Sequence, residues 1–146
     1  MTIDTSGKWW VGSEPADIMG FLEAYTEEEY PATEFRLAKC SCGSVDFNLE
    51  ADDSEGCAKR ICAKCGEEHL ICDSEEYWEE AAPEKWKCVE CKSKATNVGV
   101  GFSLYDDKSA VRWLYVGVRC SRCGILGCFA GWKVAYEPSL QLMDQV

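Results

Sequence analysis

Histidine is nearly absent from this sequence, and basic residues are outnumbered by acidic ones. The 146 residues include one histidine, His69, and 15 Lys and Arg against 26 Asp and Glu, so the formal net charge is −11 and the pI is near 4.5. This balance excludes electrostatic attraction to nucleic acid as a property of the whole surface. Because Leu70 and Ile71 follow His69, the H-x-E pattern of the zinc deaminases is also missing.

Long apolar runs are missing too. No window approaches the roughly 18–20 apolar residues that span a bilayer, so we expect no membrane association. Residues 1–5 lead directly into polar sequence without the parts of a secretory signal, and we therefore expect a cytoplasmic protein. A hydrophobic fraction of 47% with 12% aromatic residues nevertheless exceeds that of a disordered acidic chain, so we expect a folded protein.

The common catalytic motifs are absent as well. The sequence contains no Walker loop, no G-x-S-x-G and no H-E-x-x-H. Its glycines between residues 99 and 131 are spread among expected strands and do not form a phosphate loop. We therefore expect that the protein is not an enzyme and has no catalytic residues.

Cysteine is abundant, with eleven residues in the chain. An odd number argues against a fully paired disulfide framework, and a cytosolic protein keeps its thiols reduced, so metal binding is the better interpretation. Eight of the cysteines form four close pairs, which are Cys40/Cys42, Cys62/Cys65, Cys88/Cys91 and Cys120/Cys123. Two C-x-x-C turns can place four thiolates around one tetrahedral metal ion, so the pairs predict two metal sites per chain.

These pairs resemble the cysteine knuckles of the zinc-ribbon class, in which rubredoxin-like turns hold a metal between antiparallel hairpins. The resemblance covers residues 35–136 and implies one zinc in each ribbon, held by Cys40, Cys42, Cys62 and Cys65 in the first and by Cys88, Cys91, Cys120 and Cys123 in the second. The first knuckle is C-x-C, which leaves Cys57 as an alternative to Cys40. Iron in place of zinc is a second alternative and implies an electron carrier.

Three cysteines and the histidine lie outside the pairs. We expect Cys72 and Cys128 to be core thiols because apolar residues adjoin them, and we expect Cys57 to be the most exposed of the three. His69 is expected to be a structural strand residue, with metal ligation or catalysis as alternatives.

Hydrophobic periodicity predicts a mainly β fold with an N-terminal α-helix and two zinc-ribbon-like antiparallel β units. The helix is expected over residues 13–30, with Ser13 as its N-cap, and a short helix over 74–82. Strands are expected over 45–50, 98–104, 110–119 and 129–134. The expected segments are an acidic helical segment at 1–34 and two ribbons at 35–87 and 88–146. The ribbons read as a tandem repeat in which Phe47 corresponds to Phe102.

The charge is uneven along these segments. Residues 1–34 carry −7, residues 35–87 carry −6 and residues 88–146 carry +2. Several aromatic residues accompany the acidic ones and are candidates for exposed contacts, with core packing as the alternative: Trp9, Trp10, Tyr77, Trp78 and Trp86. We predict a zinc-stabilised protein-interaction module that binds a basic protein partner, of which an antitoxin or immunity protein would be one kind.

A second hypothesis is binding of nucleic acid or of the transcription machinery through the second ribbon. Basic and aromatic residues in this ribbon would form a stacking platform, unless the aromatic rings fill the core. The residues concerned are Lys92, Lys94, Arg112, Trp113, Tyr115, Arg119, Arg122, Trp132 and Lys133.

Overall fold

The chain folds around one antiparallel sheet. The computed structural model describes residues 3–108, 110–134 and 139–146, and it contains helices α1 (Asp17–Tyr25) and α2 (Glu75–Trp78) and the 3-10 helix η1 (Leu140–Asp144) in that part of the chain. The strands are β1 (Glu34–Leu37), β2 (Phe47–Asp52), β3 (Cys57–Cys62), β4 (Glu68–Leu70), β5 (Glu84–Lys85), β6 (Thr96–Leu104), β7 (Val111–Cys120) and β8 (Leu126–Lys133). The predicted fold class, mainly β with one helix near the N-terminus, is confirmed.

The sheet consists of two units with the same plan. Strands β1 to β4 form the first unit and β5 to β8 the second, and the order along the sheet is β4-β3-β2-β6-β7-β8. In each unit a short strand leads into a cysteine loop, a long hairpin, a second cysteine loop and a last strand.

The short leading strand of each unit pairs with the long strand of the other unit. Strand β1 pairs with β6, where Leu37 lies opposite Gly99, and β5 pairs with β2, where Lys85 lies opposite Glu50. Backbone hydrogen bonds extend both contacts, because Ala38 N donates to Val98 O at 2.9 Å and Trp86 N donates to Leu49 O at 2.8 Å. Each unit therefore contributes its short leading strand to the other unit, and this exchange makes the two units approximately symmetric.

The centre of this relation lies at a single residue pair between the units. Phe47 of β2 pairs with Thr96 of β6. Within their own hairpins, Phe47 pairs with Cys62 and Thr96 pairs with Cys120, so the two residues hold equivalent places. The predicted correspondence of Phe47 with Phe102 is therefore wrong. The residue equivalent to Phe47 is Thr96, because each of the two pairs with the first cysteine of the second loop in its own unit.

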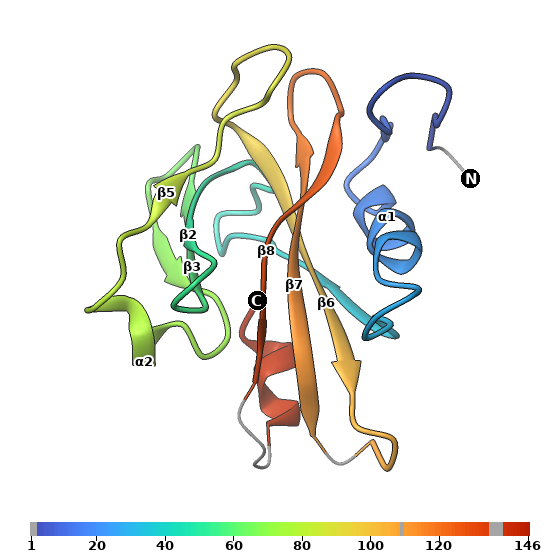
Figure 1. The fold of residues 1–146 in the computed structure, drawn as a ribbon. Helices are drawn as coiled ribbons and strands as arrows, with labels where there is room; N and C mark the ends of the chain where they lie inside the picture. The colour runs from blue at the N-terminus through green and yellow to red at the C-terminus, as the bar shows by residue number, and fades with distance from the viewer. Residues whose placement is uncertain (1–2, 109, 135–138) are drawn as a thin grey trace.

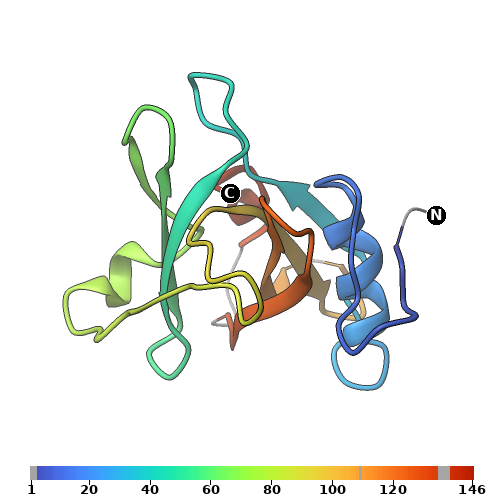
Figure 2. The same ribbon diagram turned by 90° about the horizontal axis from the view of Figure 1, so that it is seen from above.

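The second unit lies between the first unit and α1. Both views place β6, β7 and β8 in the middle, with β2, β3 and α2 on one side and α1 on the other (Figures 1 and 2). The inner faces of the two units share one core, which includes Phe47, Leu49, Val98, Val100, Phe102, Leu114 and Val116. A smaller cluster, with Ile18 and Leu22 fully buried, joins α1 to the outer face of the second unit.

Helix α1 is shorter than the sequence predicted. It begins at Asp17 after Ala16, and Ser13 is not its N-cap. The carboxylate of Asp17 instead accepts hydrogen bonds from the backbone N–H groups of Ser13 at 2.8 Å and Glu14 at 3.2 Å, which holds the preceding turn outside the helix. The predicted apolar face is real at Ile18 and Leu22, whereas Tyr25 is 60% exposed.

The sequence predicted the places of four strands and missed β1, β3, β4 and β5, of which β3 has six residues. Strands β2, β6, β7 and β8 overlap the predicted ranges, and α2 occupies only part of residues 74–82. Strands β1 and β5 have four and two residues, too few for a period to be visible. Their place is determined by pairing with the other unit.

Candidate metal centres

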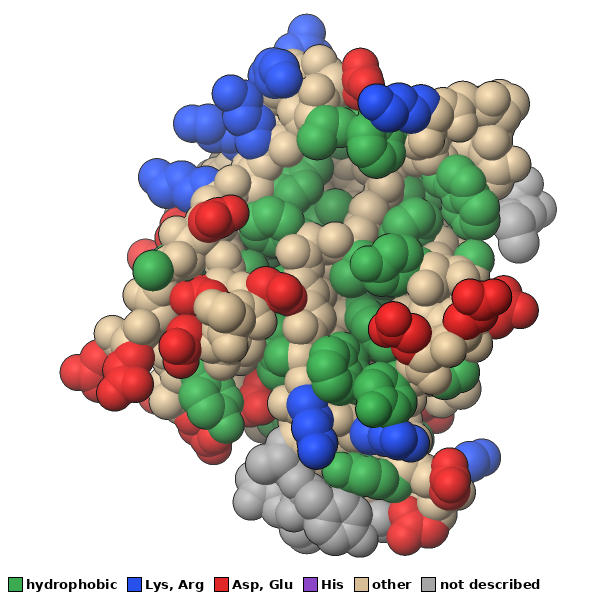
Figure 3. Space-filling view, in the orientation of Figure 1, with side chains coloured by type: hydrophobic (Ala, Val, Ile, Leu, Met, Phe, Trp, Pro, Cys, Tyr) green, Lys and Arg blue, Asp and Glu red, His purple; other side chains and the backbone are tan. Residues whose placement is uncertain are grey.

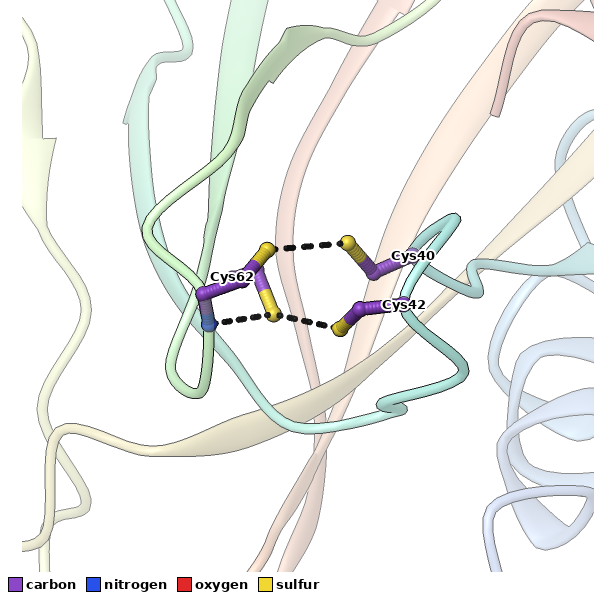
Figure 4. Close-up of side chains that lie close together, drawn as sticks. Cys40, Cys42 and Cys62 are labelled. Atoms are coloured by element: carbon purple, nitrogen blue, oxygen red, sulfur yellow. Dashed lines mark hydrogen bonds between the residues drawn. The ribbon is translucent and has the colours of Figure 1, made fainter.

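The first cysteine group, Cys40, Cys42, Cys62 and Cys65, lies at one end of the first unit. The loop after β1 carries Cys40 and Cys42, while β3 ends in Cys62 and the next turn carries Cys65. The side chains of Cys40, Cys42 and Cys62 point toward one another from these two loops (Figure 4). Sγ atoms are 3.5 Å apart for Cys40 and Cys65 and 3.6 Å apart for Cys42 and Cys62.

The second cysteine group, Cys88, Cys91, Cys120 and Cys123, repeats this arrangement. Cys88 and Cys91 lie between β5 and β6, and Cys120 ends β7. The Sγ atoms of Cys88 and Cys123, and those of Cys91 and Cys120, are 3.5 Å apart. In each group the four sulfurs all lie within 4.8 Å of one another.

These distances match a tetrahedral tetrathiolate centre. A metal–sulfur bond of about 2.3 Å places the sulfurs of a regular tetrahedron about 3.8 Å apart. Both groups can therefore hold a metal ion with little movement, as expected of zinc-ribbon-like knuckles. Four sulfur ligands would complete the tetrahedron and leave no coordination position open to a substrate.

The turns that carry the sulfurs need a left-handed residue. Gly43, Gly66 and Gly124 follow three of the cysteine pairs and have φ values of 94°, 81° and 82°. The fourth turn has Lys92 at this place with a φ of 65°, a conformation unfavourable for a side chain with a Cβ. The turn at Lys92 has the same backbone hydrogen bond as the turn at Gly66, since Lys92 N donates to Cys88 O at 3.2 Å and Gly66 N donates to Cys62 O at 3.0 Å.

Backbone N–H groups favour the thiolate at one cysteine of each group. The N–H groups of Cys65 and Lys64 donate to Cys62 Sγ, each at 3.4 Å, and lower the pKa of Cys62 to about 6. Burial raises the pKa of Cys120, but N–H groups from Cys123 and Arg122 outweigh it and bring this pKa to about 7. Both thiols are thus prepared for ionisation, as metal ligation requires.

The two groups differ in how much water reaches their outer sulfurs. Each group has two buried cysteines, Cys40 and Cys62 in the first and Cys88 and Cys120 in the second. The remaining pair is exposed in the first group, at Cys42 and Cys65, and only half-buried in the second, at Cys91 and Cys123. A chelator or an oxidant therefore has easier access to the first group.

The residues that the sequence left outside the pairs also lie outside the two groups. Cys40, and not Cys57, is in the first group. The expectation that Cys57 is exposed is wrong: it is fully buried at the start of β3, and burial raises the pKa of its thiol. Cys72 is buried as predicted, whereas Cys128 is half-buried and packs against the cluster beneath α1.

His69 is a strand residue of β4, as predicted. Its Nε2 lies 2.7 Å from the backbone oxygen of Gln145, and it belongs to neither cysteine group.

Arg60 pairs with His69 in the β3–β4 ladder, and its burial was not predicted from the sequence. Arg60 is only 7% exposed; its Nε donates to Val146 O at 2.8 Å, and burial lowers its pKa against the influence of the nearby thiol of Cys40. No sequence motif predicts the burial of Arg60, because it follows only from the side of β3 on which this residue lies.

The aromatic residues divide between core and surface. Trp86, Tyr115 and Trp132 are buried, so they pack in the interior, while Trp9 and Tyr77 are 37% and 36% exposed. The expected platform in the second unit is also divided along β7. Arg112 lies near the start of this strand and Arg122 follows its end, roughly 30 Å away at about 3.4 Å per residue.

Charge is segregated on the surface. In Figure 3, Lys and Arg gather over the cysteine loops of the second unit, and Asp and Glu gather over α2 and beside α1. The basic end includes the exposed side chains of Lys87, Lys92, Lys94 and Arg122. The acidic region at α2 includes Glu75, Glu76, Glu79 and Glu80, all exposed.

Comparisons with protein families, with curated proteins and with solved structures found no match to this chain. Among the described residues, no helix has the length and apolar character needed to cross a membrane.

Proposed function

We propose that each cysteine group binds one structural zinc ion and that the protein is a non-catalytic, zinc-stabilised module for protein interaction. The observation that carries this proposal is the closed set of four sulfurs within 4.8 Å in each group. Thiolate sets of this kind suit zinc, which prefers a tetrahedral site and has no redox chemistry of its own. A site with four protein ligands supports a structural role over a catalytic one.

Zinc would act here as a cross-link between the two loops of each unit. Cys40 and Cys42 would be joined to Cys62 and Cys65, and the second group would be joined in the same way. Structural zinc contributes roughly 10–16 kcal/mol of apparent binding free energy in small zinc peptides. This is comparable with the whole stability of a typical domain, roughly 5–15 kcal/mol.

The acidic region at α2 is the surface that we propose for the basic protein partner. Four exposed glutamates, Glu75, Glu76, Glu79 and Glu80, surround Tyr77, which is 36% exposed. Carboxylates steer a basic partner toward the surface, and an aromatic side chain supplies contact area after the encounter. An antitoxin-like or immunity-like protein that covers a basic toxin is the sharper form of this proposal.

The metal proposal is tested by elemental analysis of the purified, reduced protein. Two zinc ions per chain are expected, with loss of the folded far-UV spectrum after chelation. One zinc per chain would point to a single functional group, and iron, visible by its colour, would replace the structural role with electron transfer. Absence of bound metal after refolding with excess zinc would overturn the proposal.

The partner proposal is tested with a fluorescent lysine-rich peptide as the probe. In one variant Glu75, Glu76, Glu79 and Glu80 become Gln; in a matched control the same change is made at Glu23, Glu27, Glu28 and Glu29, which are exposed and carry the same charge. Binding is expected to weaken more in the first variant than in the control, and to fall steeply with added salt. Equal weakening in both variants would show only a general charge effect and reject α2 as the docking surface.

A further inference from the structure

A small pocket of aromatic and basic residues lies at the end of the second unit opposite the cysteine loops. Its volume is about 290 Å³, and it is lined by Tyr30, Tyr105, Arg112, Trp113 and Lys133. The lining comes from three parts of the chain: the segment after α1, the loop after β6, and the paired strands β7 and β8. Figure 3 shows basic side chains beside hydrophobic ones at this end of the molecule.

The aromatic rings hold the guanidinium of Arg112 in place. Its Cζ lies 4.2 Å from the ring centre of Tyr30 and 5.9 Å from that of Tyr105. Tyr30 in turn stacks on Trp113, with ring centres 5.2 Å apart and an angle of 22° between the planes. Tyr115 secures this column, since its hydroxyl donates to Tyr30 O at 3.0 Å. A guanidinium held in this way loses little further freedom when a ligand binds.

The two cations of the pocket have no anionic partner among the residues that the structure describes. The ion pair found in this part of the chain joins Lys59 and Glu68, far from the pocket in the sheet, and no described carboxylate pairs with Arg112 or Lys133. Lys133 lies opposite Trp113 in the β7–β8 ladder and is exposed. Two cations thus lie together at one pocket without a neutralising carboxylate from the described part of a chain whose net charge is −11.

We propose that this pocket binds a dianionic phosphate group. A guanidinium whose face covers a ring still offers its in-plane N–H donors, which fit the oxygens of a phosphate. Two cations match the charge of a phosphate monoester, roughly −1.5 to −2 at neutral pH, better than that of a single carboxylate. The volume is at the lower end of ligand pockets, about 300 Å³, which leaves room for a phosphate with a small organic part. This proposal does not depend on the metal or on the basic partner.

The test is an NMR titration that follows the indole N–H of Trp113 and the backbone N–H of Lys133. The probes are inorganic phosphate and a nucleoside monophosphate, with acetate as a monoanion of carboxylate chemistry. Saturable shifts at both signals are expected with either phosphate; tighter binding of the nucleotide would show that the organic part also makes contact, and equal binding that free phosphate suffices. No saturable shift with either phosphate, or equal binding of acetate, would overturn the proposal.

Variants separate this pocket from general attraction to basic residues. Lys133→Gln and Arg112→Gln are each expected to weaken phosphate binding about tenfold or more, because each removes a charge-assisted contact. Arg112→Lys keeps the charge but removes the planar donors, so it tests the geometry if Arg112→Gln fails to fold. The matched control, Arg122→Gln at the basic end, should bind phosphate as the wild type does. Loss of binding in Arg122→Gln with retention in Lys133→Gln would reject the pocket, and the amide NMR spectrum of each variant reports folding independently.

Discussion

The two units have the same order of strands and cysteine loops, but different side chains and helices lie on their outer faces. In the second unit this face contains the paired residues Gly99 and Gly117, against which Ile18 of α1 packs. The equivalent pair in the first unit is Glu50 and Lys59, where the short helix α2 approaches with Trp78, whose ring centre lies 5.1 Å from Lys59 Nζ. A Cβ at Gly117 would lie 2.6 Å from Ile18 Cγ2, so only glycine admits the helix at this distance. The same arrangement of strands can thus form the middle layer of the molecule or its outer layer, depending on which side chains lie on its outer face.

The largest change should come from removing a buried sulfur in either unit. Cys62→Ser and Cys120→Ser each leave three ligands, and because the proposed zinc would supply about as much free energy as a typical domain has, the altered unit should unfold. The exchanged strands should pass the effect on, since β5 pairs with β2 and β1 with β6. The readouts are zinc per chain and the amide spectrum of both units.

Cys128→Ala is the control for these two variants, because Cys128 is half-buried and lies outside both groups. It should retain two zinc ions. An unchanged spectrum for the second unit in Cys62→Ser would show that the two units fold independently.

The cysteine groups could be predicted from the sequence because their information is local. Pairs separated by one or two residues define a turn, and two turns define a site. The pairing of β1 with β6 is not local, since Leu37 and Gly99 are distant in the chain. No residue pattern in β1 predicts this pairing. Burial of Cys57 was missed for a related reason: its neighbours Glu55 and Gly56 suggest a surface turn, whereas tertiary packing of Trp132 against Gly56 closes this region.

Substitution of Gly117 should test the close packing of α1 on the second unit, which the first unit does not share. Gly117→Ala brings a methyl group within 2.9 Å of both Ile18 and Leu22, and overpacking of this kind costs about 1–3 kcal/mol. Urea unfolding measures the loss. Gly127→Ala in β8 is the matched control, since its nearest contact is Val118 at 3.5 Å. Equal losses in both variants would attribute the effect to strand propensity and not to α1.

The difference in exposure between the groups should appear in the rate of metal loss. We expect a chelator to remove zinc from the first group about tenfold faster, because Cys42 and Cys65 are exposed whereas Cys91 and Cys123 are half-buried. Zinc release followed by a colorimetric chelator should then show two phases. Assignment by the NMR signals of Gly66 and Gly124 identifies the faster site, and a single phase would contradict the comparison.

The smallest effect is expected at the one turn without glycine. Lys92→Gly should stabilise the protein by up to about 1 kcal/mol, because glycine has no Cβ and adopts the left-handed conformation without steric cost. Gly43→Ala at the equivalent turn should destabilise it, since its φ is 94°. Thermal unfolding of the zinc-loaded protein compares the two. Destabilisation by Lys92→Gly would mean that the contact of Lys92 Nζ with Val89 O at 3.2 Å outweighs the backbone strain.

The exchange of leading strands also determines the order of events during protein synthesis. A ribosome releases β1 to β4 well before β6, yet β1 finds its partner only in β6, more than 60 residues later. Until the β6–β7 hairpin leaves the ribosome, strand β1 of the nascent first unit is therefore unpaired, and the inner face of this unit is only partly covered. Early zinc binding at Cys40 and Cys62 would hold that unit closed in the interval. Zinc supply in the cell would then influence the yield of folded protein as well as the stability of the finished one.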